Sequence, residues 1–271
     1  MMKYKKLIVC LFIFFFFFSG SSCTSPLFNT VTVIESFAAI WVNRSYLVKA
    51  FNELHKEKRR DQFVIMKYYV DSTADHPFPR LSCAEAEERM KWYMPTDRGI
   101  PTTFFNGTEY MKGIPNPYED NEEGKIKAFK EYINERISEI HARIPPITIT
   151  ASCKRQETQD DFTISVSVKA TDTLSYSSLI LQIALVENNI PYSAINGEDF
   201  HYFVFREWIK PPEIKDTIGI PLALKEVGDQ YEAEFTYHLN SELYKQELSM
   251  IVFVQDRETK AILQGIEITP T

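Results

Sequence analysis

Two cysteine thiols are the candidate reactive groups in the body of the chain, Cys83 and Cys153. Cys83 stands at the start of a predicted helix, where the dipole favours a thiolate, so one hypothesis makes it a peroxidatic or sensing thiol of lowered pKa. A second hypothesis joins the two thiols in a disulfide, which an oxidising compartment permits but sequence spacing cannot establish. We favour two unreactive thiols, because a helix start is only one of the features that a reactive cysteine needs.

The other residue types that could do chemistry do not form a recognisable site. A loop with Asp71, Asp75 and His76 could hold a cation only if it folded back on itself, and the acidic stretch 119–123 lacks the alternation and glycine of a calcium loop. The sequence also contains no glycine-rich phosphate motif and no Gly-x-Ser-x-Gly. The five histidines lack the paired spacing of a metal site; they are His55, His76, His141, His201 and His238. We therefore expect no metal, no cofactor and no catalytic residue.

Residues 1–22 have the order of a secretory signal peptide. Three lysines precede an apolar run from Leu7 to Phe18, and small residues 19–22 precede Cys23. The apolar run is shorter than the roughly 20 residues that span a bilayer, so we expect cleavage. Small residues followed by cysteine resemble the lipobox of bacterial lipoproteins, although Gly20 stands where leucine is most usual. This resemblance implies that Cys23 is acylated, by chains such as palmitate; ordinary cleavage nearby and an uncleaved anchor are the alternatives.

The charge balance excludes one class of partner. The chain of 271 residues has a formal net charge of −7, and removal of the signal lysines makes it more acidic. Nucleic-acid binding depends on clustered Lys and Arg. The short run Lys56–Arg60 instead resembles the solvated end of a helix, where cations offset the dipole. We expect no nucleic-acid partner.

A change in composition near Ile144-Pro145-Pro146 divides the chain. Before it, strand and helix patterns alternate; after it, short β-type runs follow one another between polar turns. We predict two domains after the signal peptide, residues 24–143 and residues 145–271.

The first predicted domain has the element order β-α-β-α-β-β-α. A helix begins after Asn43, a second begins with a capping box from Ser82 to Glu85, and Asn106-Gly107 forms a hairpin turn. The predicted strands are 31–37, 63–70, 102–105 and 109–112, and the last helix carries an apolar face from Ile126 to Ile140.

The second predicted domain is all-β. Seven short strands favour an immunoglobulin-like sandwich. The strands are expected at 147–152, 162–168, 179–186, 202–209, 231–239, 248–254 and 261–268. His201, Arg206 and Trp208 stand out within an aromatic strand, and packing or contact between the domains is their expected role.

Three segments of the first domain resemble the thioredoxin superfamily. They are Glu35-Ser36-Phe37 before Trp41, Gly99-Ile100-Pro101-Thr102-Thr103, and Asn106-Gly107. With the segments 179–188, 201–206 and 251–260 of the second half, the chain is more closely similar to bacterial envelope lipoproteins related to a twenty-eight-kilodalton outer membrane protein. The resemblance implies a thioredoxin-like α/β domain followed by a β-sandwich, in an exported protein anchored at the outer membrane.

The residues that match the redox site of this family lack its chemistry. In Trp41-Val42-Asn43-Arg44-Ser45, the two redox cysteines are replaced by Val42 and Ser45. Neither side chain can attack a disulfide as a thiolate does.

The remaining segment that the resemblance points to is Ile100-Pro101-Thr102. It corresponds to the cis-proline segment that faces such a site, and the backbone of Ile100 could bond an extended peptide there. We predict a non-catalytic protein that binds a protein or peptide. The alternatives are a peptide-binding chaperone and a thiol oxidoreductase or peroxidase that uses Cys83, with Cys153 as resolving partner.

Overall fold

The structure is a computed structural model. It describes residues 29–40, 45–57, 59–70, 81–96, 99–113, 121–157, 160–195, 197–214, 219–239 and 247–271. Cys23 and the segment from Trp41 to Arg44 lie outside the described residues, and of Ser45 only the backbone is described. The predictions for signal cleavage, lipidation and the altered redox motif therefore stay predictions.

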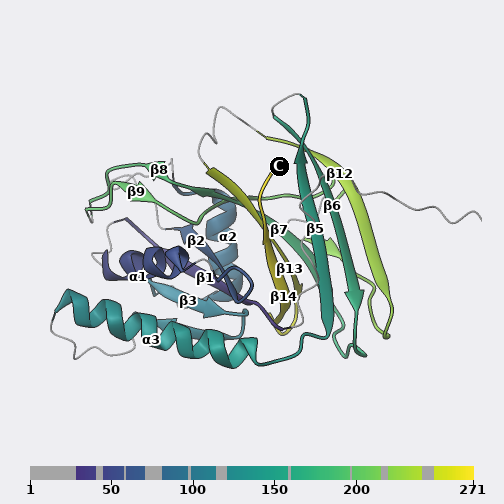
Figure 1. The fold of residues 1–271 in the computed structure, drawn as a ribbon, viewed down its shortest axis with the longest axis horizontal. Coiled ribbons are helices and arrows are strands. Elements are labelled where there is room, and N and C mark those ends of the chain that lie inside the picture. Colours follow the sequence, from purple (N-terminus) through teal and green to yellow (C-terminus); the bar gives the residue numbers. More distant parts are fainter. Residues whose placement is uncertain are drawn as a thin grey trace, which may run out of the picture.

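The first half contains the predicted order of strands and helices (Figure 1). The elements are β1 (Thr32–Ala38), α1 (Ser45–Lys56), β2 (Phe63–Tyr69), α2 (Ala84–Tyr93), β3 (Thr102–Phe105), β4 (Glu109–Lys112) and α3 (Glu122–His141). Helices α1 and α3 lie side by side in front of the sheet in Figure 1, and α2 lies behind it. The ring of Phe51 in α1 meets Phe129 in α3 at 5.3 Å between centroids, edge to face.

The two helix starts in this half differ in their capping. At α3, the side chain of Asn121 accepts a hydrogen bond from the Gly124 amide at 2.7 Å, which satisfies one of the open amides of the first turn. At α2, the cap position is Cys83, whose side chain makes no capping bond. The predicted Ser82–Glu85 capping box is wrong, because the Glu85 carboxylate accepts instead from the Trp208 amide at 3.2 Å.

The second half supplies all seven predicted strands and three shorter ones. They are β5 (Ile147–Arg155), β6 (Asp161–Ala170), β7 (Leu179–Asn188), β8 (Ile190–Pro191), β9 (Phe200–His201), β10 (Val204–Trp208), β11 (Ile220–Pro221), β12 (Gln230–His238), β13 (Glu247–Asp256) and β14 (Ile262–Ile268). Strands β8 and β9 form a separate hairpin, which extends over the end of the molecule that carries α1 (Figure 1).

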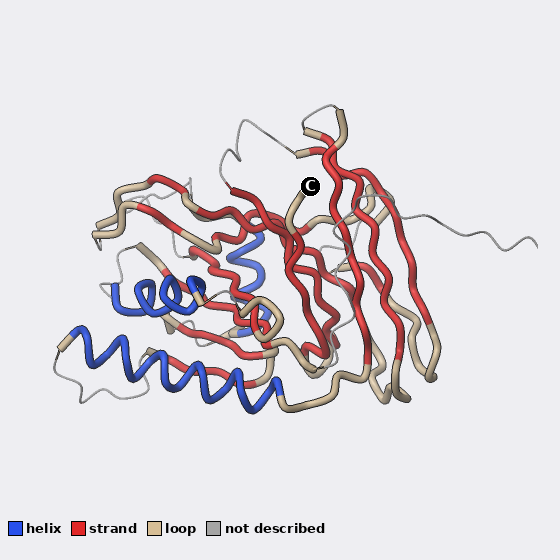
Figure 2. The backbone as a smooth tube through the Cα atoms, viewed as in Figure 1, coloured by secondary structure: helices blue, strands red, loops and turns tan. Residues whose placement is uncertain are grey.

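One mixed sheet of nine strands runs through both halves of the chain (Figure 2). Its order is β14-β13-β7-β10-β2-β1-β3-β4, with β11 paired to β7. The halves join where β10 pairs with β2 in parallel, at Val204 and Lys67. The other strands, β12, β6 and β5, form a second sheet. The protein is thus a mixed α/β fold with a large sheet, while the domain boundary and the immunoglobulin-like assignment stay predictions.

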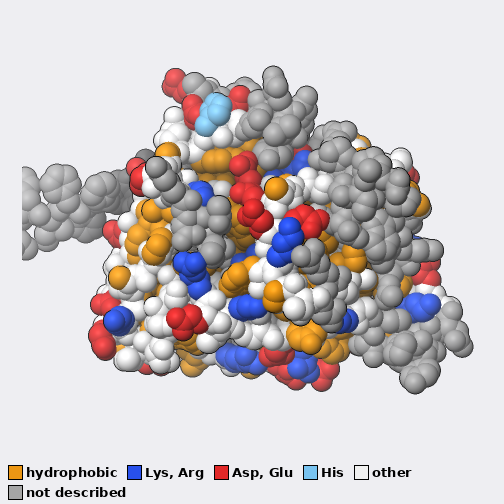
Figure 3. Space-filling view, turned by 180° about the vertical axis from the view of Figure 1, so that it is seen from behind, with side chains coloured by type: hydrophobic (Ala, Val, Ile, Leu, Met, Phe, Trp, Pro, Cys, Tyr) orange, Lys and Arg blue, Asp and Glu red, His pale blue; other side chains and the backbone are white. Residues whose placement is uncertain are grey.

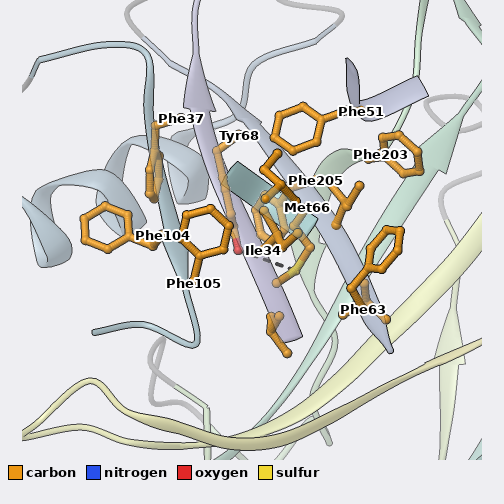
Figure 4. Close-up of a cluster of buried hydrophobic side chains, with 14 of the residues drawn as sticks. Ile34, Phe37, Phe51, Phe63, Met66, Tyr68, Phe104, Phe105, Phe203 and Phe205 are labelled. Carbon is orange, nitrogen blue, oxygen red and sulfur yellow. Dashed lines mark hydrogen bonds between the residues drawn. The ribbon is translucent and has the colours of Figure 1, made fainter. Parts of the chain in front are cut away.

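Two large apolar cores follow from this arrangement. One fills the space between the two sheets, with β5 and β6 opposite β7 and β13. The other lies around β1 and β2 and is shared by both halves, since Phe203 and Phe205 pack there with Phe37, Phe51 and Tyr68 (Figure 4). The rings of Tyr68 and Phe205 are 4.7 Å apart between centroids. Because burial of apolar side chains is the dominant stabilising term, the two halves stabilise each other.

The turn between β3 and β4 is a second point of contact between the halves. Asn106 and Gly107 have positive φ angles of 43° and 76°, as an Asn-Gly hairpin turn requires. The Asn106 carbonyl accepts from the Ile262 amide at 2.9 Å, and its side chain accepts from the Val33 amide at 2.6 Å. A Cβ atom at Gly107 would lie 1.9 Å from the carbonyl oxygen of Lys260, so only glycine fits there.

On the face opposite to that of Figure 1, basic side chains of the surface are interspersed with acidic and apolar ones (Figure 3). Within the described ranges, no helix combines the length and apolar character needed to cross a membrane.

Candidate functional site

The structure brings Pro101 against the end of β1 and the first turns of α1. A small cavity of about 20 Å³ lies between these elements. We call its apolar wall the Pro101 groove, formed by Ala38, Ala39, Leu47, Val48 and Pro101. The Ile100–Pro101 peptide bond beside this cavity is cis.

The backbone groups of residues 99–102, beside the groove, differ in whether they are hydrogen-bonded. The Pro101 carbonyl accepts from the Gly113 amide at 3.0 Å, and the Thr102 hydroxyl donates to the Gly99 carbonyl at 2.5 Å. Ile100 is half-buried, and neither its amide nor its carbonyl has a hydrogen-bond partner in the part of the chain that the structure describes. An extended segment that passes here could pair with this peptide unit as a strand pairs with a sheet edge.

Four polar side chains also line the cavity: Ser36, Lys67, Tyr69 and Glu198. Ser36 comes from β1, whereas Lys67 and Tyr69 point from the adjacent strand β2. Glu198 comes from the β8–β9 hairpin of the second half. The site is consequently built from both halves of the chain.

A buried chain of hydrogen bonds runs from this cavity to the hairpin. The Nε2 atom of His201 lies 2.9 Å from the Tyr192 carbonyl, which can only accept, so this nitrogen carries the proton. The Tyr69 hydroxyl then donates to Nδ1 of His201 at 2.6 Å. Burial, together with the positive charge of Lys67, lowers the pKa of His201, which fits a neutral ring.

The sequence analysis singled out His201 for packing but missed its partners. Tyr69 is 132 positions away in the chain, and no local pattern links the two residues. The signal that could have found Lys67 was a lysine inside the apolar run Phe63–Tyr69, since a charge in a buried strand needs a compensating environment.

The other two residues of the aromatic strand, Arg206 and Trp208, are packed against different parts of the protein. Arg206 forms a buried ion pair with Glu187 at 2.8 Å. Trp208 packs on Phe205, with 4.7 Å between ring centroids, and lies 5.3 Å from the Arg89 guanidinium of α2. Trp208 thus packs between the halves, whereas the ion pair of Arg206 lies within the second half.

Both cysteines are free thiols in protected surroundings. Cys83 is half-buried beside the α2 start, and burial raises its pKa to about 11, an effect that the amides of the helix start offset only in part. Cys153 faces the core between the sheets, and burial raises its pKa to about 12. Neither cysteine lines the Pro101 groove. The geometry therefore does not supply the lowered pKa that the Cys83 enzyme hypothesis requires.

A buried ion pair lies on the other side of β1. The Arg89 guanidinium donates to both oxygens of Glu35, at 2.9 and 3.0 Å, and to the Gln255 side-chain oxygen at 2.8 Å. Tyr68 and Tyr93 also donate to Glu35. These hydrogen-bond partners are all buried, so this cluster connects β1, α2 and β13 and acts structurally.

Metal coordination gains no support from the described residues. No group of three or more His, Cys, Asp or Glu side chains among them is arranged to hold an ion.

Comparisons with known proteins identify similar folds but no family. No family model matches the chain, and no curated protein matches it. The structure is similar to HBP35 of Porphyromonas gingivalis, with a TM-score of 0.63 and 16% sequence identity over 90% of this chain and 78% of that chain. It is also similar to a protein from Agrobacterium tumefaciens, with a TM-score of 0.52 and 12% identity over 89% and 95% of the two chains.

A domain of the outer membrane lipoprotein Omp28 from Porphyromonas gingivalis matches less well. Its TM-score is 0.33 and its identity 16%, over 48% of this chain and 93% of that chain, and no argument rests on it. The first two matches cover both halves, so the architecture as a whole occurs in other proteins. At these identities, the likeness concerns the fold alone.

Proposed function

We propose that this protein is a non-catalytic lipoprotein of the bacterial cell envelope that binds extended peptide segments at the Pro101 groove. The observation that carries the proposal is the peptide unit of Ile100 beside that groove, which has no hydrogen-bond partner among the described residues. Backbone pairing supplies affinity in this binding mode, and pockets for side chains supply specificity.

A thioredoxin-like first half is part of this proposal. Its support is the strand order β2-β1-β3-β4, with β1 parallel to β2 and antiparallel to β3, and helices on both faces. A cis proline before β3 fits the same assignment. The immunoglobulin-like second half is supported by two packed sheets with antiparallel strands.

The proposed location rests on the sequence. A charged start, an apolar run and small residues before Cys23 favour export and acylation of that cysteine. Acylation by more than one chain would hold the protein at a membrane surface, by analogy at the outer membrane, since one chain binds only marginally.

The binding proposal is tested with residues 23–271 carrying Cys23→Ser, panned against a random peptide library displayed on phage. Peptides that are enriched are then measured by fluorescence anisotropy. Val48→Arg, which places a long charged side chain in the groove wall, is expected to weaken binding at least about tenfold, because the groove is filled and made polar.

Val227→Arg is the matched control, since Val227 is 64% exposed in a turn of the second half. Circular dichroism is used to check that both variants are folded. Peptides whose affinity is equal for wild type, Val48→Arg and Val227→Arg would place binding elsewhere and overturn the proposal.

A chaperone differs from a protein with one dedicated partner because it acts on unfolded client proteins in general. If the protein suppresses aggregation of a reduced, denatured client and Val48→Arg abolishes the suppression, the groove serves unfolded chains in general. Peptide binding without such suppression supports a dedicated partner.

A further inference from the structure

Lys67 is a buried cation with too few partners. Its side chain is 2% exposed, and its ammonium group carries three N–H donors. Among the described residues, its ammonium makes one hydrogen bond within 3.5 Å, to the Tyr69 hydroxyl at 3.4 Å. Burial lowers the pKa of this amine, while the charge of Glu198 acts in the opposite direction. A buried donor left without an acceptor is costly, so this group needs an oxygen in the cavity.

The charged and titratable groups around the ammonium define what that oxygen can be. Glu198 lines the same cavity, and its Oε2 atom lies 3.7 Å from Nδ1 of His201. Tyr69 already donates its proton to His201. Ser36, on the β1 side, lies 3.1 Å from the Thr103 hydroxyl. An added carboxylate would face Glu198, and an added cation would face Lys67, so a neutral oxygen fits best.

The size of the cavity further limits which chemical group can supply this oxygen. A space of about 20 Å³ holds one group of the size of a water molecule. A hydroxyl fits and can accept from Lys67 while it donates to Glu198. Larger polar side chains do not fit.

We propose that this cavity is a hydroxyl-selective subsite of the Pro101 groove, in which Lys67 binds the serine or threonine side chain of the bound peptide. This inference rests on the proposed peptide binding and adds the class of side chain that the site selects. Alternate side chains of an extended segment point to opposite faces, so one residue of the segment would point into the cavity.

The test compares three proteins in the same phage selection: wild type, Lys67→Met and Lys49→Met. Lys67→Met keeps the length of the side chain and removes the buried charge, a change that proteins commonly tolerate. Lys49→Met is the control, since Lys49 lies on α1 with a side chain that is 55% exposed. We expect serine or threonine to be enriched at one position of peptides selected on wild type and Lys49→Met, and alanine or valine at that position on Lys67→Met.

Pairs of synthetic peptides that differ only in serine or alanine at the selected position measure how much the hydroxyl contributes to affinity. Wild type should lose about tenfold or more in affinity for the alanine peptide, because a hydrogen bond to a charged group is lost. Lys67→Met should bind both peptides within about twofold. A second readout, independent of the variant, is the Nζ resonance of labelled lysine in wild type, which should shift with the serine peptide and not with the alanine peptide.

The possible failures are distinguishable. Groove-dependent peptides without any serine or threonine preference would overturn this inference and leave the proposed function standing; the cavity would then hold only solvent water. A serine preference that persists unchanged in Lys67→Met would also overturn it. If wild type selects no peptide that Val48→Arg weakens, the proposed function fails and this inference fails with it.

Discussion

The thiols allow a quantitative test of the non-catalytic assignment. In residues 23–271 with Cys23→Ser, Cys83 and Cys153 are the remaining cysteines. The Cys83 pKa of about 11, compared with an ordinary 9.0, lowers the thiolate fraction near pH 8 about 100-fold. The more basic thiolate is intrinsically more nucleophilic, by roughly 6- to 10-fold over two pKa units. Cys83 should therefore react about 10-fold more slowly in the folded protein than in the unfolded chain, before any steric protection is counted.

Cys153 should be slower still. Its pKa of about 12 lowers the thiolate fraction about 1,000-fold, and the gain in nucleophilicity recovers roughly 16- to 32-fold, which leaves a reduction of roughly 30- to 60-fold. Its side chain lies in the core with 2% exposure, so reaction also requires local opening.

The assay is titration with an aromatic disulfide reagent, in native buffer and in concentrated urea, before and after stoichiometric peroxide. Two thiols should be counted in urea without prior reduction, both should react slowly in native buffer, and peroxide should change neither. A Cys83 that reacts as fast in the folded protein as in urea, or is lost to peroxide, would refute the reasoning. A count of fewer than two thiols before reduction would instead reveal a disulfide and revive the thiol-enzyme alternative.

Three further outcomes concern stability, measured by urea unfolding. Arg89→Met should destabilise the protein by about 3–5 kcal/mol, because the buried Glu35 carboxylate loses its ion partner; adding Glu35→Gln to that variant should recover part of the loss. Burial raises the pKa of Glu85 to about 7 from 4.5, so its ionisation costs stability as pH rises through that window. The full shift corresponds to roughly 3 kcal/mol, and solvent screening of this half-buried carboxyl reduces it, so Glu85→Gln should gain roughly 2 kcal/mol at pH 8 and nothing at pH 4. Gly107→Ala should cost at least about 2 kcal/mol, since its Cβ would collide with the Lys260 carbonyl. An equal effect of Glu85→Gln at both pH values, or no cost from the other two variants, would contradict these contacts.

The sequence was sufficient for the elements, because local patterns encode them. The apolar face of α3 and the Asn106-Gly107 turn lie where periodicity and turn chemistry predict. The capping box failed because its glutamate bonds to Trp208, 123 positions away. A cap rule includes only neighbours in the chain, and tertiary contact overrides it here.

The sequence also carries a signal that assigns strands to the large or the small sheet. In β5 and β6, buried and half-buried residues alternate, as in a sheet with one wet face. In β2 and β7 every residue is buried, as in a central strand covered on both sides. The run Leu179–Val186, apolar except for Gln182, therefore distinguishes a strand of the large sheet from those of the small one. The sequence does not indicate which strands pair with each other. The pairing of Val204 with Lys67, for example, depends on backbone bonds that any sequence can make.

The joined sheet changes how the site depends on the second half. Glu198 reaches the cavity from a hairpin that starts directly after β7 and ends just before β10, and His201 of the same hairpin bonds to Tyr69 in the cavity wall. Strand β10 is hydrogen-bonded to β2 next to Lys67, and Phe203 accepts from the Lys67 amide at 2.7 Å. Any displacement of β10 therefore moves the backbone that holds Lys67 and the hairpin that faces it. Because binding at the Pro101 groove would involve both, we expect the second half to be part of the recognition surface.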